Sequence, residues 1–373
     1  MRRRDFLKTA TGACILASTG LGNFLTNSYA FGPTENLSKV EAKYYKKLPD
    51  KESKCELCPR ECVVGDKERG YCGVRENMDG KYYTLVYGKV CSLNVDPIEK
   101  KPFFHFLPGT GAFSIATTSC NVNCKFCQNW EISQIRPEQA KNYDLPPKEV
   151  VEFAKKYNCP TIAYTYTEPV IFYEYMYDTA KQGHRQGVRS VVVTGSHINP
   201  KPMEDLTKVV EAIKIDLKAF SEEFYKNYVR GELKPVLEAA KIVYKSKKWM
   251  EIVYLVIPTL NDSPAEIRKM SQWVIKNIGP DIPIHFSRFW PMYLMKNLPQ
   301  TPISTLEKAR NIALKEGINY VYIGNVPGHK GESTYCPKCK KTVIKRFGYK
   351  ILENNLKKGK CSNCGHPIPG VWL

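Results

Sequence analysis

Seven short apolar runs between residues 112 and 324 constrain the fold of this chain most, because helical patterns separate them. The strand-like runs are 112–118, 161–166, 189–195, 211–217, 249–257, 282–287 and 319–324. The helical patterns between them are 147–157, 168–183, 234–246, 263–277 and 304–317. Strands that alternate with helices are joined by right-handed crossovers and form a parallel sheet. The sequence therefore predicts an α/β fold, a partial (βα)6-type barrel with its chemistry at the carboxyl ends of the strands.

Three cysteines follow the first predicted strand closely. Cys120, Cys124 and Cys127 (the cysteine triplet) fall in SCNVNCKFCQNW, on a loop where a barrel carries catalytic groups. A structural zinc site takes four ligands and a disulfide takes two, so three thiols suit neither. Iron–sulfur clusters are held by cysteine thiolates, and three thiolates leave one iron of a four-iron cluster open. For this spacing alone, zinc with a distant fourth ligand is the alternative.

The series of motifs resembles the radical SAM superfamily, in particular the AmmeMemoRadiSam-system radical SAM enzymes, relatives of pyruvate formate-lyase activating enzymes. The resemblance covers about 55–373 and rests on CELCPRECVVGDKERGYCGVR, DPIEKKPFFHFLPGTGAFSIATTSCNVNCKFCQNWEISQ, AYTYTEP, KIDLKAF, HFSRFWPMY and YVYIGNVPGHKGESTYCP. It implies that the cysteine triplet holds a [4Fe-4S] cluster whose open iron binds S-adenosylmethionine (SAM). It further implies reductive SAM cleavage to a 5′-deoxyadenosyl radical that abstracts hydrogen from a substrate, with a low-potential electron donor as partner.

The resemblance also implies SAM contacts on the first two strand-end loops. Phe126, before the last cysteine of the triplet, is expected near the adenine. Glu168, in TYTEP (165–169), is expected near the SAM amino group. Tyr166 and Thr167 stand where relatives have two glycines, which leaves the backbone geometry of this loop open.

Further SAM contacts are expected at later strand ends, at Thr194, Asp216, Lys218 and His285. Asp216 and Lys218 point to one side of their strand, because alternate residues of a strand share a face. A surface ion pair is the plain alternative for these two residues. For His285, the alternative is an ordinary core histidine.

Two quartets of cysteines flank the predicted barrel. The C-terminal quartet, Cys336, Cys339, Cys361 and Cys364, consists of two C-x2-C pairs around the β-rich TVIKRFGYKI, which is typical of a zinc ribbon. The N-terminal quartet is Cys55, Cys58, Cys62 and Cys72. Its spacing predicts a closed structural site and favours zinc. A second four-iron cluster and two disulfides are the alternatives, and an electron relay requires proximity to the cysteine triplet.

The N-terminus resembles a twin-arginine (Tat) export signal. RRRDFLK at 2–8 precedes a weakly apolar stretch and SYA at 28–30. A disordered basic tail is the alternative, and the apolar stretch is too short to span a membrane. The predicted division of the chain is a signal peptide at 1–30, a linker at 31–54, a cysteine-rich module at 55–110, a radical SAM core at 111–330 and a zinc-ribbon-like module at 331–373. The signal indicates the cell envelope or periplasm, whereas dependence on SAM indicates the cytoplasm.

The charge of the chain does little to identify a partner. Lys and Arg number 56 against 37 Asp and Glu, a net charge of +19, but the excess is spread along the sequence. Thiolates that bind metal would subtract from it, so a nucleic-acid partner is not expected. The leading hypothesis is a radical SAM enzyme of unassigned reaction. The alternatives are an activating enzyme that acts on a glycine of a glycyl-radical partner, a role beside a Memo-like protein, and a non-catalytic iron–sulfur or nucleic-acid-binding protein.

Overall fold

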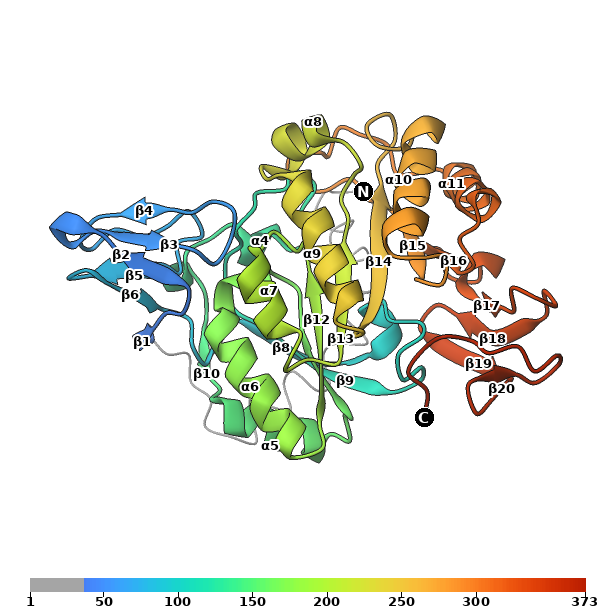
Figure 1. The fold of residues 1–373 in the computed structure, drawn as a ribbon, viewed down its shortest axis with the longest axis horizontal. Helices are drawn as coiled ribbons and strands as arrows, with labels where there is room; N and C mark the ends of the chain where they lie inside the picture. Colours follow the sequence, from blue (N-terminus) through green and yellow to red (C-terminus); the bar gives the residue numbers. More distant parts are fainter. Residues whose placement is uncertain (1–36) are drawn as a thin grey trace, which may run out of the picture.

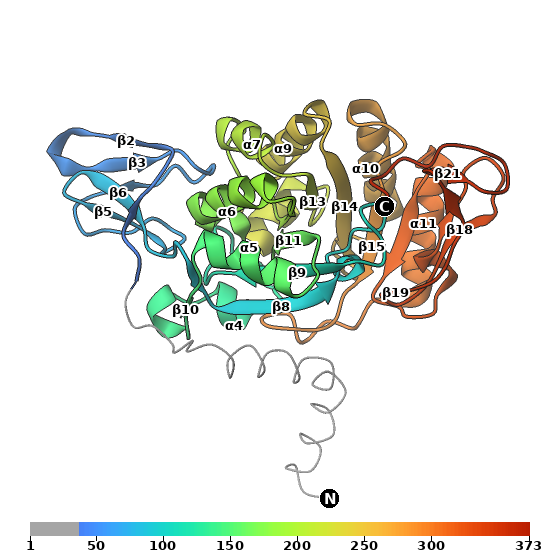
Figure 2. The same ribbon diagram turned by 90° about the horizontal axis from the view of Figure 1, so that it is seen from below.

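The computed structural model describes residues 37–373, and the expected Tat-like signal at 1–30 lies outside them. A central curved sheet carries helices on its outside, and two small β modules lie at opposite ends of the molecule (Figures 1 and 2). Within residues 37–373, no helix is both long and apolar enough to cross a membrane.

The central sheet has eight strands in the order β16-β15-β14-β13-β12-β11-β9-β8. Seven of them pair in parallel: β9 (Gly111–Ala116), β11 (Thr161–Tyr164), β12 (Arg189–Thr194), β13 (Ala212–Asp216), β14 (Trp249–Val256), β15 (Ile284–Arg288) and β16 (Val321–Gly324). All seven strands predicted from the apolar runs are confirmed. The edge strands β8 and β16 do not pair with each other within the described residues, so the barrel is open there.

The helices between these strands bury one face each, as their periodicity predicts. They are α5 (Pro147–Lys156), α6 (Tyr173–Arg185), α7 (Pro200–Leu206), α9 (Leu233–Lys245), α10 (Pro264–Asn277) and α11 (Ile303–Glu316). Ser263 caps α10 by accepting the Glu266 N–H, with proline at the first helical position. Gly317 ends α11 at a φ of 112°, a conformation that glycine adopts without strain.

Strand β8 (Ser92–Pro97) belongs to the central sheet, although its sequence lies in the predicted cysteine-rich module. It pairs antiparallel with β9, with Asp96 opposite Ala112. A 3-10 helix (Ile98–Lys100) and a loop join the two strands. No helical pattern separates β8 from β9 in the sequence. The alternation of apolar runs with helical patterns, which predicted the other strands, therefore did not predict β8.

The N-terminal module contains two three-stranded antiparallel sheets. One consists of β1 (Val40–Glu41), β6 (Lys81–Thr84) and β5 (Arg75–Met78), and the other of β2 (Tyr45–Lys47), β3 (Ser53–Cys55) and β4 (Val63–Val64). Residues 40–54 therefore differ from the predicted linker. Lys46 and Lys47 lie on exposed positions of β2, while Tyr44 packs on Tyr173 of α6 at 5.1 Å between ring centroids.

Short elements complete the fold around the first loop and at the C-terminus. Strand β7 (Lys89–Val90) pairs with β10 (Tyr143–Asp144), and α4 (Trp130–Ser133) follows the cysteine triplet. The C-terminal module consists of β17 (Thr334–Tyr335), β18 (Thr342–Phe347), β19 (Lys350–Asn354), β20 (Leu356–Lys357) and β21 (Lys360–Cys361). It is fixed to the loop before β9, because buried Arg346 donates to the Phe104 carbonyl at 2.7 Å.

Candidate active site

The cysteine triplet lies on the loop after β9, at the carboxyl edge of the parallel sheet. Two backbone hydrogen bonds hold the loop against a π-helical segment, η5 (Tyr225–Val229): Asn123 donates to Val229 at 3.0 Å, and Lys125 donates to Tyr228 at 2.9 Å. Burial raises the pKa values of the Cys120 and Cys124 thiols, because a thiolate loses its hydration there. These thiolates need compensating charge from a neighbour or a metal.

Glu168 presents a buried carboxylate beside the triplet. One oxygen accepts the Thr194 hydroxyl at 2.5 Å and the Val170 N–H at 3.2 Å, and the other accepts the Gly195 N–H at 2.8 Å. Burial raises the pKa of Glu168 against these hydrogen bonds. Glu168 and Thr194 were each predicted as SAM contacts, and the structure brings the two side chains together. Thr194 contacts Glu168, and this contact fixes the orientation of the carboxylate.

Asp216 lies between two lysines at the end of β13. Lys218 Nζ is 2.9 Å from Asp216 Oδ2, and Lys214 Nζ pairs with Oδ1. The predicted placement of Asp216 and Lys218 on one side is therefore confirmed. Burial opposes ionisation of Asp216, but the two ammonium groups outweigh it and hold the pKa at about 2. Lys218 also faces Cys124, where its charge lowers the thiol pKa against the larger effect of burial.

The TYTEP loop keeps a glycine-like backbone although it has no glycine. Tyr166 has a φ of 66°, in the left-handed region that glycine favours. The Asn129 side chain donates to the Tyr166 carbonyl at 2.7 Å and stabilises this conformation. The Tyr166 hydroxyl donates to Asp96 of β8, and Asp96 is paired with buried Lys101. The question left open by the sequence is thus answered for Tyr166.

Comparison with known proteins identifies the family. Residues 114–270 match the radical SAM superfamily. The uncharacterized protein MJ0808 of Methanocaldococcus jannaschii is 46% identical over 330 residues, which cover 88% of this chain and 98% of that protein. The chain belongs to the radical SAM superfamily. A second uncharacterized protein of that organism, MJ0674, is 24% identical over 72% of this chain and 76% of its own length.

Solved structures of radical SAM proteins are similar in fold. A radical SAM methyltransferase from Sphaerobacter thermophilus is 14% identical, with 86% of each chain covered and a TM-score of 0.49. A domain of a pyruvate-formate lyase-activating enzyme from Bacteroides vulgatus is 15% identical, covering 44% of this chain and 98% of the domain, with a TM-score of 0.39.

The residues at the sheet edge fit the cofactors of a radical SAM protein. Three thiols on one loop match a four-iron cluster with one open position. The ionised Asp216 and Lys218 lie beside Cys124, and such groups suit the amino acid part of SAM. Membership of the radical SAM superfamily implies that the protein uses a [4Fe-4S] cluster and SAM.

Phe126 and His285 contact protein groups. The Phe126 ring packs at 5.8 Å from Phe224, between ring centroids. His285 is 1% exposed, and its Nε2 is 2.6 Å from Glu251 Oε2. Its ring stacks on Tyr322 at 5.0 Å, and burial lowers its pKa. His285 therefore occupies the position of a paired core histidine, although its Nδ1 has no hydrogen-bond partner among the described residues.

Three polar residues near the site were missed by the sequence reasoning: Asp96, Lys101 and Lys214. Lys214 precedes Asp216 by two residues, so the alternation of a strand was a signal that could have found it. Asp96 and Lys101 fall within the predicted cysteine-rich module at 55–110. Their involvement depends on β8 joining the central sheet, for which the sequence gave no periodic signal.

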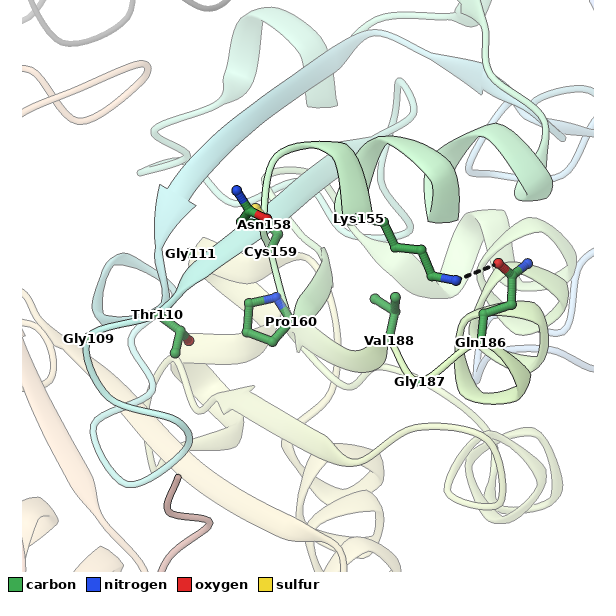
Figure 3. Close-up of a pocket in the computed structure, with 10 residues that line it drawn as sticks. All are labelled: Gly109, Thr110, Gly111, Lys155, Asn158, Cys159, Pro160, Gln186, Gly187 and Val188. Atoms are coloured by element: carbon green, nitrogen blue, oxygen red, sulfur yellow. Dashed lines mark hydrogen bonds between the residues drawn. The ribbon is translucent and has the colours of Figure 1, made fainter.

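A separate hollow lies at the amino-terminal edge of the parallel sheet, opposite the edge that carries the cysteine triplet, and is not the candidate active site. It has a volume of about 600 Å³ and opens to solvent beside the amino ends of β9, β11 and β12 (Figure 3). Lys155 and Gln186, the long polar side chains in it, hydrogen-bond to each other at 2.9 Å. In parallel α/β folds chemistry collects at the carboxyl ends of strands, where the triplet lies.

Proposed function

We propose that this protein is a radical SAM enzyme of the AmmeMemoRadiSam type, with its [4Fe-4S] cluster on Cys120, Cys124 and Cys127. The observation that carries the proposal is the meeting of the triplet with Glu168, Asp216 and Lys218 at the carboxyl edge of the sheet. When bound, the cluster and SAM supply a 5′-deoxyadenosyl radical by reductive cleavage of a carbon–sulfur bond.

The residues of the chain have binding and positioning roles in this proposal. Thr194 and the Gly195 N–H fix the Glu168 carboxylate, which can still accept from a SAM ammonium group through a remaining lone pair. Asp216 holds Lys218 beside Cys124, where the ammonium group is available to a SAM carboxylate. Phe126 supports the triplet loop through Phe224.

The function is tested with protein reconstituted with iron and sulfide under anaerobic conditions, reduced and supplied with SAM. We expect 5′-deoxyadenosine in the wild-type reaction and none when the three triplet cysteines are alanine. Hydrogen abstraction is detected separately, by adding deuterated cell extract and measuring deuterium in the 5′-deoxyadenosine. A fully loaded, reduced wild type that leaves SAM intact would refute the proposal.

We also propose that the C-terminal quartet holds zinc. Cys336 Sγ and Cys364 Sγ are 3.6 Å apart, and Cys339 Sγ and Cys361 Sγ are 3.7 Å apart. A tetrahedral zinc site with Zn–S bonds of about 2.3 Å separates its sulfurs by about 3.8 Å. The quartet also lies away from the sheet edge that carries the triplet, which supports a structural role.

A further inference from the structure

The four cysteines of the N-terminal quartet line one hollow. Cys55 is the last residue of β3, Cys58 and Cys62 lie on the connection to β4, and Cys72 precedes β5. The cavity among them and their neighbours is small, about 20 Å³. All four are free thiols, so the structure gathers four possible metal ligands around one point.

The spacing of these sulfurs differs from that of the C-terminal quartet. Among residues 37–373, the C-terminal quartet is the group whose possible ligand atoms all lie within 4.8 Å of one another. The N-terminal quartet does not reach that spacing. A single zinc ion needs sulfurs about 3.8 Å apart, whereas a four-iron cluster holds its cysteines further apart because four irons and four sulfides stand between them. The wider arrangement fits the larger group.

Hydrogen-bond donors surround the quartet as they would surround ionised sulfurs. Each sulfur accepts at least one N–H: Cys55 from the Arg75 side chain, Cys62 from the Tyr71 backbone, Cys58 from the Arg60 backbone and the Asn121 side chain, and Cys72 from the Val74 backbone. Arg75 is 1% exposed and is paired with Glu174. Its guanidinium places a fixed positive charge beside thiolates that carry net negative charge even when bound to metal.

The quartet also contacts the loop of the cysteine triplet. The Ser119 hydroxyl donates to the Cys72 carbonyl, and Arg60 Nε donates to the Asn121 carbonyl at 2.6 Å. The Asn121 side chain itself lines the hollow. Ser119 and Asn121 are the two neighbours of Cys120 in the chain, so a short stretch of backbone separates the two groups of cysteines.

We propose that Cys55, Cys58, Cys62 and Cys72 bind a second [4Fe-4S] cluster, which relays single electrons toward the cysteine triplet. A low-potential one-electron donor protein reduces this cluster by one electron and is itself oxidised by one. The cluster returns to its oxidised state when the electron passes on. Tyr71 is 49% exposed beside the hollow, under the Arg60 guanidinium at 3.4 Å, and marks the side open to the donor.

The decisive experiment removes the first cluster. In a variant with all three triplet cysteines replaced by alanine, prepared anaerobically with iron, sulfide and zinc, we expect about four irons and about one zinc per chain. The Mössbauer spectrum should be that of a [4Fe-4S] cluster. About two zincs with no iron, or fewer than about three irons, would overturn the proposal. This readout does not depend on SAM cleavage, so its failure is distinct from that of the proposed function.

A second measurement uses the wild type, should the triple variant fail to fold. We expect about eight irons per chain and two reduced cluster signals in electron paramagnetic resonance, of which SAM shifts one. Replacing Cys62 and Cys72 together by alanine leaves two thiols, fewer than the triplet uses, and should remove the signal that SAM leaves unchanged. It should also slow reduction of the other cluster by a donor protein. Cys91→Ala, outside both groups, should change neither. About four irons in the wild type, or an unaltered pair of signals in the variant that lacks both Cys62 and Cys72, would refute the second cluster.

Discussion

Replacing Asp216 by asparagine tests the charge arrangement at the edge of the sheet. The variant removes the negative charge that pairs with Lys214 and Lys218. The Asp216 pKa is about 2 in the folded chain against an ordinary value of 3.8. At about 1.4 kcal/mol for each pKa unit, the ionised carboxylate stabilises the fold by about 2 kcal/mol at neutral pH. Asp216→Asn should therefore lower the free energy of unfolding of the metal-free protein by about this amount.

Asp205 provides a matched control, because it also lies between two lysines. Lys201 and Lys208 pair with it, but both side chains are 66% exposed. Water and salt screen such a pair, so Asp205→Asn should cost less than about 1 kcal/mol. Chemical denaturation of both variants and the wild type measures the difference. Equal losses would refute the claim that burial at the sheet edge strengthens the Asp216 pairs.

The pH dependence of this effect follows from the direction of the Asp216 pKa shift. Because the folded pKa is depressed, the stabilisation is present above about pH 4 and is lost as the pH falls through about 2. The difference between wild type and Asp216→Asn should therefore stay constant from pH 5 to pH 8. A difference that changes by more than about 1 kcal/mol over that range would show that another group carries the effect.

The same variant separates SAM binding from cluster assembly. Asp216→Asn should retain the cluster, because the triplet keeps its three thiols. It should weaken SAM binding roughly tenfold or more, the effect of one lost hydrogen bond to a charged group. Calorimetry or equilibrium dialysis with reconstituted protein measures the affinity. Unchanged affinity would exclude Asp216 as a SAM contact, and Asp205→Asn should bind SAM as the wild type does.

The remaining predictions concern the metal sites, the N-terminal module and the signal. Single alanine substitutions in the cysteine triplet should each abolish the oxygen-sensitive cluster and SAM cleavage; one variant that retains both would exclude the cluster assignment. Glu174→Gln should cost about 3 kcal/mol by leaving buried Arg75 without its partner, whereas Glu316→Gln, paired with half-exposed Arg268, should cost less than about 1 kcal/mol in the same denaturation assay. Cys339→Ala should remove about one zinc and no iron by elemental analysis; unchanged zinc would contradict the ribbon assignment. Fractionation should find a processed chain in the cell envelope, and an unprocessed chain wholly in the cytoplasm would contradict the signal.

The sequence predicted the parallel strands well because each is a short apolar run bounded by a helical pattern. It failed where that rhythm was absent, at β8, at the two-residue strand β1 and at β2, which contains two lysines. Lysine at an exposed strand position resembles lysine in a linker, and contacts such as those of Tyr44 with Tyr173 and Asp205 distinguish the two. Such contacts join residues that are far apart in the chain, and the hydrophobic periodicity of a short segment cannot predict them.

The candidate site was predictable where one short segment carries its chemistry, as in the cysteine triplet or in Asp216 and Lys218. It was not predictable where side chains from separate segments meet. Tyr166, just after β11, reaches Asp96 of β8 on the far side of β9. His285 of β15 pairs with Glu251 of the neighbouring strand β14. Both pairings depend on register, since a shift by one residue turns a side chain to the other face of the sheet.

The two cysteine quartets show why ligand spacing in the sequence does not determine the metal. Both begin with a C-x2-C pair, which predicts zinc at either place. In the C-terminal module a second C-x2-C pair faces the first, and the sulfurs converge to zinc distances. In the N-terminal module the later cysteines arrive on separate connections, and buried Arg75 and Tyr82 line the space between them. How far the backbone allows the four sulfurs to approach one another therefore decides which metal group fits, and the wider spacing of the N-terminal quartet is the reason why we propose a cluster there.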